Sequence, residues 1–325
     1  MDYSRSEAKA AARKQFRGVW AAITTPFTPD LKVDEAGLRH NMRHVTDGLH
    51  VDGVFCTGVM GEFWALTSEE RKRIVEIVVE EAKGKCRVIA HTGHHSADET
   101  VELTRHAERA GADYVILMNP YYPFVTDEMA FDWFSYVAQR TDIGIWLFDT
   151  GFSDRAALSP ELFARLAELP NLCGAKISRT LDHYLAVQKA CGDALVLSSP
   201  AETQFLMMMR EHGQRVHQSS AAPMLLQTRA SQRMRKYAEL GLAGRFDEAQ
   251  QVSSGLDALR KVQHQWVMGD YQKTNILPIA AIKAWSEVLG MAGGPVRTPL
   301  LQIPSERRAA MRQDIESTGL LDWRD

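Results

Sequence analysis

The sequence has few cysteines and no segment typical of secretion or membrane insertion. Its four cysteines form no CxxC pair; they are Cys56, Cys86, Cys173 and Cys191. A chain of 325 residues can bury a large core without covalent cross-links, so we expect reduced, buried thiols. The opening MDYSRSEAKAAARKQF lacks an apolar stretch. These absences predict a cytoplasmic protein with no membrane partner.

An excess of basic residues is also missing. Lys and Arg total 38 against 41 Asp and Glu, and no basic stripe is interleaved with aromatic residues, which argues against a nucleic-acid partner. Hydrophobic residues make up 45% of the chain, as in globular proteins with a large core. The length suits one α/β barrel of about 250 residues with an appended helical piece.

Short apolar runs alternate with helical patterns from Gly18 onward. Most runs are continuous in apolarity, as in parallel strands covered on both faces. Helix starts are marked by Thr67 with Glu70 and Ser96 with Glu99, at capping-box spacing. The predicted strands are residues 19–24, 53–56, 87–91, 114–118, 144–148, 173–177, 195–199 and 215–219. Eight βα units predict a (β/α)8 barrel.

The strand pattern divides the chain into three parts. We expect an N-terminal extension over 1–16, the barrel over 17–223, and a helical region over 224–325 that packs on the barrel. The last part contains no strand pattern and predicts three or four helices. It is a candidate oligomer interface.

Lys176 is a charged residue in a run that should be apolar. It lies near the end of the sixth predicted strand, and (β/α)8 barrels build their active sites at the carboxyl ends of strands. Burial lowers the pKa of an amine, which then becomes a nucleophile toward carbonyl groups and can form a Schiff base. The alternative is a side chain that reaches solvent or pairs with Glu62.

A glycine-rich segment, GVMGEF, follows the second predicted strand. Gly58 and Gly61 allow a tight turn close to a ligand, and exposed amides there suit a carboxylate. An ordinary βα turn is the more frequent origin of such a segment.

Five segments together resemble the dihydrodipicolinate synthase and N-acetylneuraminate lyase superfamily. Across residues 17–305 they are ITTPFTPD, residues 58–62, NPYY at 119–122, the GAK strand with Lys176, and NILPIAAIKAW with GGPVRTPL. The resemblance implies a barrel with a helical extension, a homotetramer, and class I aldolase chemistry without metal or organic cofactor. It implies an imine between Lys176 and a 2-oxo acid such as pyruvate, whose carboxylate is held by backbone amides around Val59 and Met60.

The chain departs from the family pattern at three places. Members carry Thr-Thr or Ser-Thr where this chain has Val59 and Met60, and a proton-shuttling tyrosine where it has Phe148. Phenylalanine cannot donate or accept a proton. The arginine that binds the second carboxylate of aspartate semialdehyde in the synthases is out of register, because Ser153 falls near its place and Arg155 follows two residues later. A role in lysine biosynthesis is therefore not expected.

Other residues are candidates for the missing proton transfer. Tyr122 matches a tyrosine of the family relay, and His91 ends the third predicted strand, where an imidazole suits acid–base chemistry near neutral pH. A hydrogen-bonded wall residue is the alternative for His91. His217 and Gln218 end the eighth run and are candidate substrate-binding residues. We expect no metal, because the histidine-rich HTGHHS segment lacks a carboxylate partner.

The sequence thus predicts a lyase that acts on a 2-oxo acid through a Lys176 imine. Tyr122 and His91 are the predicted proton-transfer residues. The predicted substrate-binding residues are Gly58, Val59, Met60, Gly61, Phe148, His217 and Gln218. Their apolar members favour a substrate with an apolar or aromatic flank. Aldol cleavage or condensation and dehydration both stay open, and a barrel that binds a 2-oxo acid without turnover is the competing hypothesis.

Overall fold

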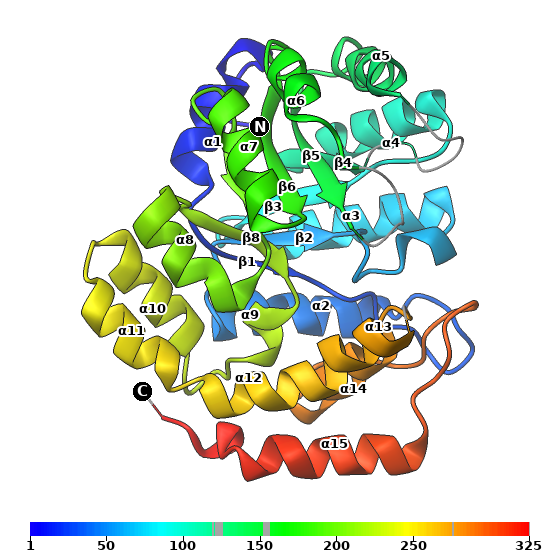
Figure 1. Cartoon of the computed structure of the whole chain (residues 1–325). Helices are drawn as coiled ribbons and strands as arrows, with labels where there is room; N and C mark the ends of the chain where they lie inside the picture. The colour runs from blue at the N-terminus through cyan, green and yellow to red at the C-terminus, as the bar shows by residue number, and fades with distance from the viewer. Residues whose placement is uncertain (119, 121–125, 152–156, 275, 325) are drawn as a thin grey trace.

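Eight strands alternate with helices along the chain (Figure 1). A computed structural model describes residues 1–118, 120, 126–151, 157–274 and 276–324. The strands are β1 (Gly18–Ala22), β2 (Gly53–Cys56), β3 (Arg87–His91), β4 (Tyr114–Met118), β5 (Gly144–Thr150), β6 (Leu172–Ser178), β7 (Val196–Ser198) and β8 (Val216–Ser220). The described α-helices are α1 (Ala8–Gln15), α2 (Glu35–Arg43), α3 (Ser68–Ala82), α4 (Ala97–Ala110), α5 (Asp127–Ala138), α6 (Pro160–Leu166), α7 (Leu181–Cys191), α8 (Phe205–His212), α9 (Ala222–Leu225), α10 (Arg233–Leu242), α11 (Phe246–Ser254), α12 (Asp257–Gln263), α13 (Gly269–Thr274), α14 (Ile279–Val288) and α15 (Ser305–Ser317).

All strand pairs are parallel, and the strand order is β7-β6-β5-β4-β3-β2-β1-β8. At the remaining seam, side-chain hydrogen bonds join β7 to β8, and the Gln214 carboxamide bonds both Ser199 and Val216. The Ser198 hydroxyl donates to the carbonyl of Val216 at 3.0 Å and accepts from the amide of Gln218 at 2.9 Å. This bridge completes the predicted (β/α)8 barrel.

The predicted runs all form strands. β2, β3 and β4 have the predicted bounds, whereas β5 and β6 run further because their pairing continues through Asp149 with Ile177 and Thr150 with Ser178. The Thr67–Glu70 capping box opens α3. At α4, Ser96 accepts from the amide of Glu99 without the reciprocal bond of a capping box.

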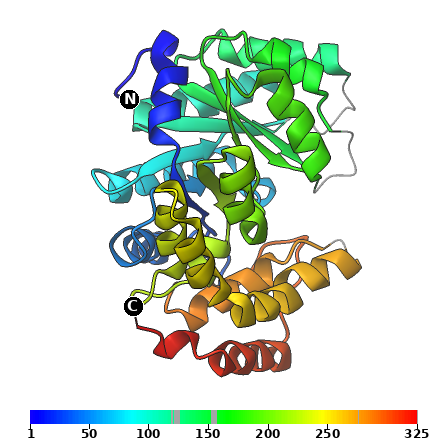
Figure 2. The ribbon, with the colours of Figure 1, turned by 60° about the vertical axis from the view of Figure 1, so that its left-hand side comes forward.

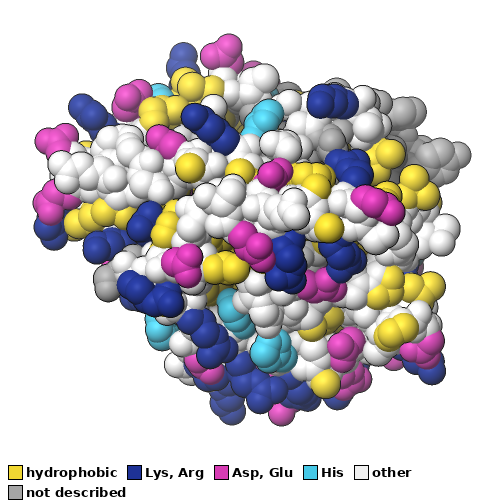
Figure 3. Space-filling view, turned by 90° about the horizontal axis from the view of Figure 1, so that it is seen from below, with side chains coloured by type: hydrophobic (Ala, Val, Ile, Leu, Met, Phe, Trp, Pro, Cys, Tyr) yellow, Lys and Arg dark blue, Asp and Glu magenta, His cyan; other side chains and the backbone are white. Residues whose placement is uncertain are grey.

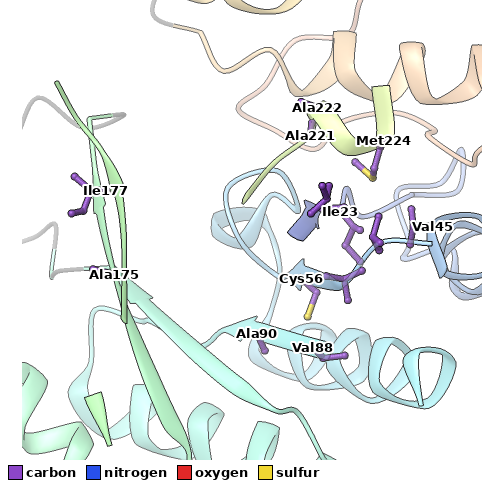
Figure 4. Packing of buried hydrophobic residues seen from close by; sticks show 14 of the residues in the cluster. Ile23, Val45, Cys56, Val88, Ala90, Ala175, Ile177, Ala221, Ala222 and Met224 are labelled. Carbon is purple, nitrogen blue, oxygen red and sulfur yellow. The ribbon is translucent and has the colours of Figure 1, made fainter. Parts of the chain in front are cut away.

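Two hydrophobic layers alternate along the strands. The outer layer lies between strands and helices, and Figure 4 shows it around Cys56, Val88 and Ala90 of β2 and β3. The inner layer fills the barrel lumen with large rings, among them Trp20 and Trp146. The four cysteines are free; three are buried as expected, and Cys86 is half-buried.

Residues 1–16 cover the amino end of the lumen. The ring of Phe16 lies 4.2 Å from that of Trp20 and 4.1 Å from that of Trp146, measured between centroids. The Tyr3 hydroxyl donates to the carbonyl of Asp113 and accepts from the amide of Gly144 at 3.0 Å. The segment is therefore part of the inner core.

The C-terminal region forms six α-helices within the described residues, more than the predicted three or four. Gly255 separates α11 from α12, and Gly269 follows a π-helical turn (His264–Met268), so the helical pattern breaks into shorter pieces. α10 packs on β1 and α8, and α14 packs on α9 and α15. Figure 2 shows the last helices grouped beside the barrel. The division at residue 223 stays a prediction.

The surface over α15 is mixed in character. Figure 3 shows this face with basic and acidic side chains interspersed and hydrophobic side chains scattered among them. The predicted oligomer interface stays a prediction.

Candidate active site

Lys176 lies at the carboxyl end of β6 with 6% of its surface exposed. Its Nζ lies 4.2 Å from the ring centroid of Phe148 and 5.1 Å from that of Phe55. Burial lowers the pKa of Lys176 from 10.5 to about 7. Among the described residues, no carboxylate pairs with it. Near pH 7 a substantial fraction of the amine is therefore in its neutral, nucleophilic form.

A cavity of about 420 Å³ opens beside Lys176. Strand ends and the loops after them provide a hydroxyl-bearing wall, formed by Ser178, Ser199, Thr203, Ser219 and Ser220. The C-terminal region provides much of the remaining wall, with Gln263, His264, Met268, Tyr271 and Ile282. A larger hollow of about 1020 Å³ lies near Asp52 and Arg87 at the amino ends of the strands and includes none of the candidate site residues.

The loop of residues 58–62 contributes Met60 to the wall. The carbonyl of Gly58 accepts from the amide of Gly61 at 3.0 Å, and that of Gly61 accepts from the Thr25 hydroxyl at 2.9 Å. A Cβ at position 58 would lie 2.4 Å from the Phe55 ring, so glycine is required there. The amides of Val59 and Met60 have no acceptor within the described chain and can therefore donate to a ligand.

His91 ends β3 as a buried, neutral imidazole. Its Nδ1 lies 3.2 Å from the carbonyl oxygen of Thr57 and 3.4 Å from the guanidinium of Arg71. Burial lowers the pKa of His91 well below its usual range, and the charges of Arg71 and Lys176 act in the same direction. Gly93 packs close to the imidazole: a Cβ atom at position 93 would lie 2.9 Å from His91 Nε2. These contacts agree with the alternative of a wall residue and weaken the case for proton transfer.

The two predicted residues on β8 face opposite ways. The His217 ring lies 5.4 Å from the ring of Phe205 in α8, which belongs to the outer layer. Burial lowers the pKa of His217 to about 3. Val216 belongs to the inner layer, so Gln218, two residues on, faces the lumen. Both carboxamide atoms of Gln218 are buried and lack a hydrogen-bond partner in the described structure. Gln218 is not among the residues that line the cavity, although Ser219 and Ser220 beside it are. Its unpaired carboxamide makes it the better candidate of the two for contact with a substrate.

A polar cluster at the ends of β5 and β6 was not predicted. The Arg179 guanidinium lines the cavity and donates to Asp149 Oδ1 from Nε at 2.9 Å, and His183 Nε2 lies 3.0 Å from Asp149 Oδ2. Asp149 is fully buried. Arg179, three residues after Lys176, is likewise a charged residue at the end of a strand, and this position is the signal that could have identified it.

Several predictions differ from this geometry. Glu62 pairs with Lys283 at 2.6 Å, so the alternative that Glu62 pairs with Lys176 is wrong. The side chains of Val59, Phe63 and Phe148 are packed in the inner layer and are not part of the cavity wall. Of the predicted apolar wall, Met60 alone among the described residues faces the cavity. Tyr122, Phe152, Ser153 and Arg155 lie outside the described residues.

The lysine, the loop and the barrel match a known protein family. The sequence pattern of the Dihydrodipicolinate synthetase family matches residues 15–318. The chain belongs to this family. Within the family, a 4-hydroxy-tetrahydrodipicolinate synthase of Methanopyrus kandleri is 33% identical over 94% of this chain and 98% of its own. A synthase of the same name from Methanothrix thermoacetophila is 32% identical over 91% of this chain and 95% of its own.

A solved family member has the same architecture. The crystal structure of dihydrodipicolinate synthase from Aquifex aeolicus superposes with a TM-score of 0.82, at 28% identity, over 94% of this chain and 99% of the other. Family membership and these names support an enzyme of the lyase type. Among the described residues, no helix is long and apolar enough to cross a membrane. The same residues contain no group of three or more His, Cys, Asp or Glu side chains placed to hold a metal ion.

Proposed function

We propose that this chain is a lyase that forms an imine between Lys176 and the C2 carbonyl of a 2-oxo acid. The observation that carries the proposal is a buried amine without a carboxylate partner in the described chain, at the wall of a cavity. Its pKa of about 7 supports nucleophilic attack near neutral pH.

The proposed chemistry uses the imine as an electron sink. Attack of the amine on C2 gives a carbinolamine, and loss of water gives an iminium. With a 4-hydroxy-2-oxo acid, a base or water takes the proton of the C4 hydroxyl, C4 becomes an aldehyde carbonyl, and the electron pair of the breaking C3–C4 bond moves to the iminium, which becomes an enamine. Protonation at C3 and hydrolysis then release pyruvate and the free amine. Condensation is the same sequence in reverse.

Substrate orientation is proposed to depend on two sets of donors. The amides of Val59 and Met60 would hold the carboxylate, with Gly58 and Gly61 allowing the close approach. The Gln218 carboxamide, buried without a described partner, would bind the carbinolamine oxygen or a reacting water molecule. The ring of Phe148 would shield the amine of Lys176 from water. His217 stays a substrate-binding proposal with weaker support, because it packs against Phe205.

Phe148 stands where the family pattern has a proton-shuttling tyrosine, so another group must transfer protons. Tyr122 and His91 stay the proposed donors and acceptors of protons, and hydroxyls of the cavity wall such as Ser219 can relay through water. We propose a cytoplasmic homotetramer or homodimer that needs no cofactor.

The direction of the reaction has two candidates. The relatives named 4-hydroxy-tetrahydrodipicolinate synthase favour condensation of pyruvate with an aldehyde. The replacement of the family's residues by Val59, Met60 and Phe148 favours a reaction on a different 2-oxo acid. That reaction would be aldol cleavage or dehydration. The hydroxyl-bearing wall and the Arg179 guanidinium suit a polar substrate better than an aromatic one.

Borohydride trapping tests the imine. Wild-type protein is reduced in the presence of pyruvate and digested, and the modified peptide is identified by mass spectrometry. We expect a single adduct on Lys176, with unmodified Lys283 as the internal control because it is buried in an ion pair. The variant Lys176→Met is expected to give no adduct. Failure to trap any of a panel of 2-oxo acids on Lys176 would refute the proposal.

Turnover separates the lyase from a barrel that only binds. The same panel, with aldehyde acceptors and sugar 2-oxo acids included, is assayed for pyruvate release or consumption. Adduct formation without turnover of any compound would favour the non-catalytic alternative.

A further inference from the structure

Lys283 is a second buried lysine, and its surroundings differ from those of Lys176. It lies in α14, its side chain is 1% exposed, and its Nζ is 2.6 Å from Glu62 Oε1. Nζ also donates to the carbonyl of Pro295 at 2.7 Å and lies 4.1 Å from the ring centroid of Phe27. The amine is therefore held on several sides by groups that favour its charged form.

Glu62 is the last residue of the loop that carries the amides of Val59 and Met60. Its side chain is fully buried, and its backbone has a left-handed φ of 56°. A residue with a Cβ rarely adopts this conformation, which needs support from surrounding contacts. Glu62 Oε2 accepts from the amide of Arg297 at 2.9 Å. Both carboxylate oxygens thus contact the C-terminal region, while the backbone of Glu62 ends the loop.

Arg297 extends the connection on the protein surface. Its guanidinium donates to both carboxylate oxygens of Glu70, at 2.6 and 2.7 Å, and to the carbonyl of Ala65 at 2.9 Å. Glu70 belongs to the capping box that opens α3. The chain from the loop to the first turn of α3 is therefore fixed to residues 283–297.

We propose that the buried Glu62–Lys283 ion pair is a positioning device: it holds the 58–62 loop so that the amides of Val59 and Met60 face the carboxylate of the 2-oxo acid. Lys283 does not touch the reacting atoms and is a positioning residue. The inference rests on the proposed function for the identity of the ligand, and on the contacts of Glu62 for the device itself. Helix α14 would then support substrate binding through Lys283, in addition to providing Ile282 to the cavity wall.

The test removes both charges together. Loss of one partner alone leaves a buried, unpaired charge and can unfold the protein, whereas the double variant Glu62→Gln/Lys283→Met leaves none. Gln at position 62 can still accept from the Arg297 amide. The matched control is Arg308→Met, which removes an ion pair between α15 and Glu287 of α14 and leaves the loop contacts intact.

The first measurement is hydrogen exchange in the peptide that spans residues 58–66. We expect exchange at least tenfold faster in the double variant than in the wild type, and unchanged exchange in Arg308→Met. This readout needs no substrate. Unchanged exchange in the double variant would overturn the positioning device, whatever the protein catalyses.

The second measurement compares two carbonyl probes in borohydride trapping. With pyruvate, we expect the half-saturating concentration to rise at least tenfold in the double variant. With acetaldehyde, which has no carboxylate, we expect a change below twofold. An equal loss with both probes, or no loss with either, would overturn the link to carboxylate binding. If the wild type traps neither probe on Lys176, the proposed function fails, and hydrogen exchange still decides the positioning device.

Discussion

At the scale of single residues, the partners of two buried lysines separate a reactive amine from a structural one. Lys283 has a carboxylate at 2.6 Å, whereas the nearest described groups around Lys176 include the rings of Phe148 and Phe55. Rings exclude water without supplying a negative charge. Burial therefore lowers the pKa of Lys176 to about 7, and the neutral amine is populated at physiological pH.

This environment predicts how Lys176 reacts as the pH changes. Trace acetylation with acetic anhydride, followed by mass spectrometry of the Lys176 peptide, measures the neutral fraction of the amine. We expect half-maximal labelling near pH 7, in place of the ordinary 10.5. Between these pH values the unfolded chain binds a proton that the native chain does not, so this lysine makes stability rise with pH by about 1.4 kcal/mol per unit. Lys176→Met should lack that rise. A labelling midpoint near 10 would contradict the burial argument.

The sequence could predict which residues lie at the strand ends, but not all of their directions. Lys176 and Gln218 were predicted because apolar runs locate the strands and charged or amide residues at their ends stand out. His217 was grouped with Gln218, since a run of polar residues gives no sign of which one faces the lumen. Glu62 and Lys283 are far apart in the chain, and only the folded barrel brings them to 2.6 Å.

At the scale of elements, α1 and Phe16 act as the base of the barrel. The segment is rich in charged residues and has no strand pattern, so the sequence predicted only an extension. Three of its apolar residues, Ala8, Ala12 and Phe16, are buried in the inner layer. Its charged side chains bind residues around the opening of the barrel: Lys9 donates to the backbone carbonyl of Ala167 and Arg13 to that of Asp193. Short apolar patterns of this kind are hard to recognise without knowing the opening that they fill.

The variant Phe16→Ala tests this role. Phe16 is 1% exposed and packs against three aromatic rings, so we expect a loss of about 3–5 kcal/mol in the free energy of unfolding, measured by denaturant titration. Phe246→Ala at the start of α11 is the control, because Phe246 is only half-buried and should cost clearly less. Equal, small losses for both variants would mean that residues 1–16 are an appendage.

At the scale of the whole molecule, the C-terminal region is joined to the barrel at several places. α10 packs on β1, Lys283 pairs with Glu62 at 2.6 Å, and the amide of Arg297 donates to Glu62 Oε2 at 2.9 Å. The cavity itself takes part of its wall from α12, α13 and α14. A barrel over residues 17–223, as divided from the sequence, would lack each of these contacts.

We therefore expect a chain cut after residue 223 to lose cooperative folding. Its β1 would lack the cover of α10, and Glu62 would lose the contacts with Lys283 and Arg297 that hold its carboxylate. Calorimetry of the full chain should give one unfolding transition, and the shortened chain should give none. A chain cut after residue 301 is the control, because it loses α15 and the buried Met311 and Ile315 but keeps Lys283. It should unfold cooperatively at a lower temperature. A cooperative transition in the chain cut after residue 223 would instead make that position a true domain boundary, and the helices beyond it an independent addition.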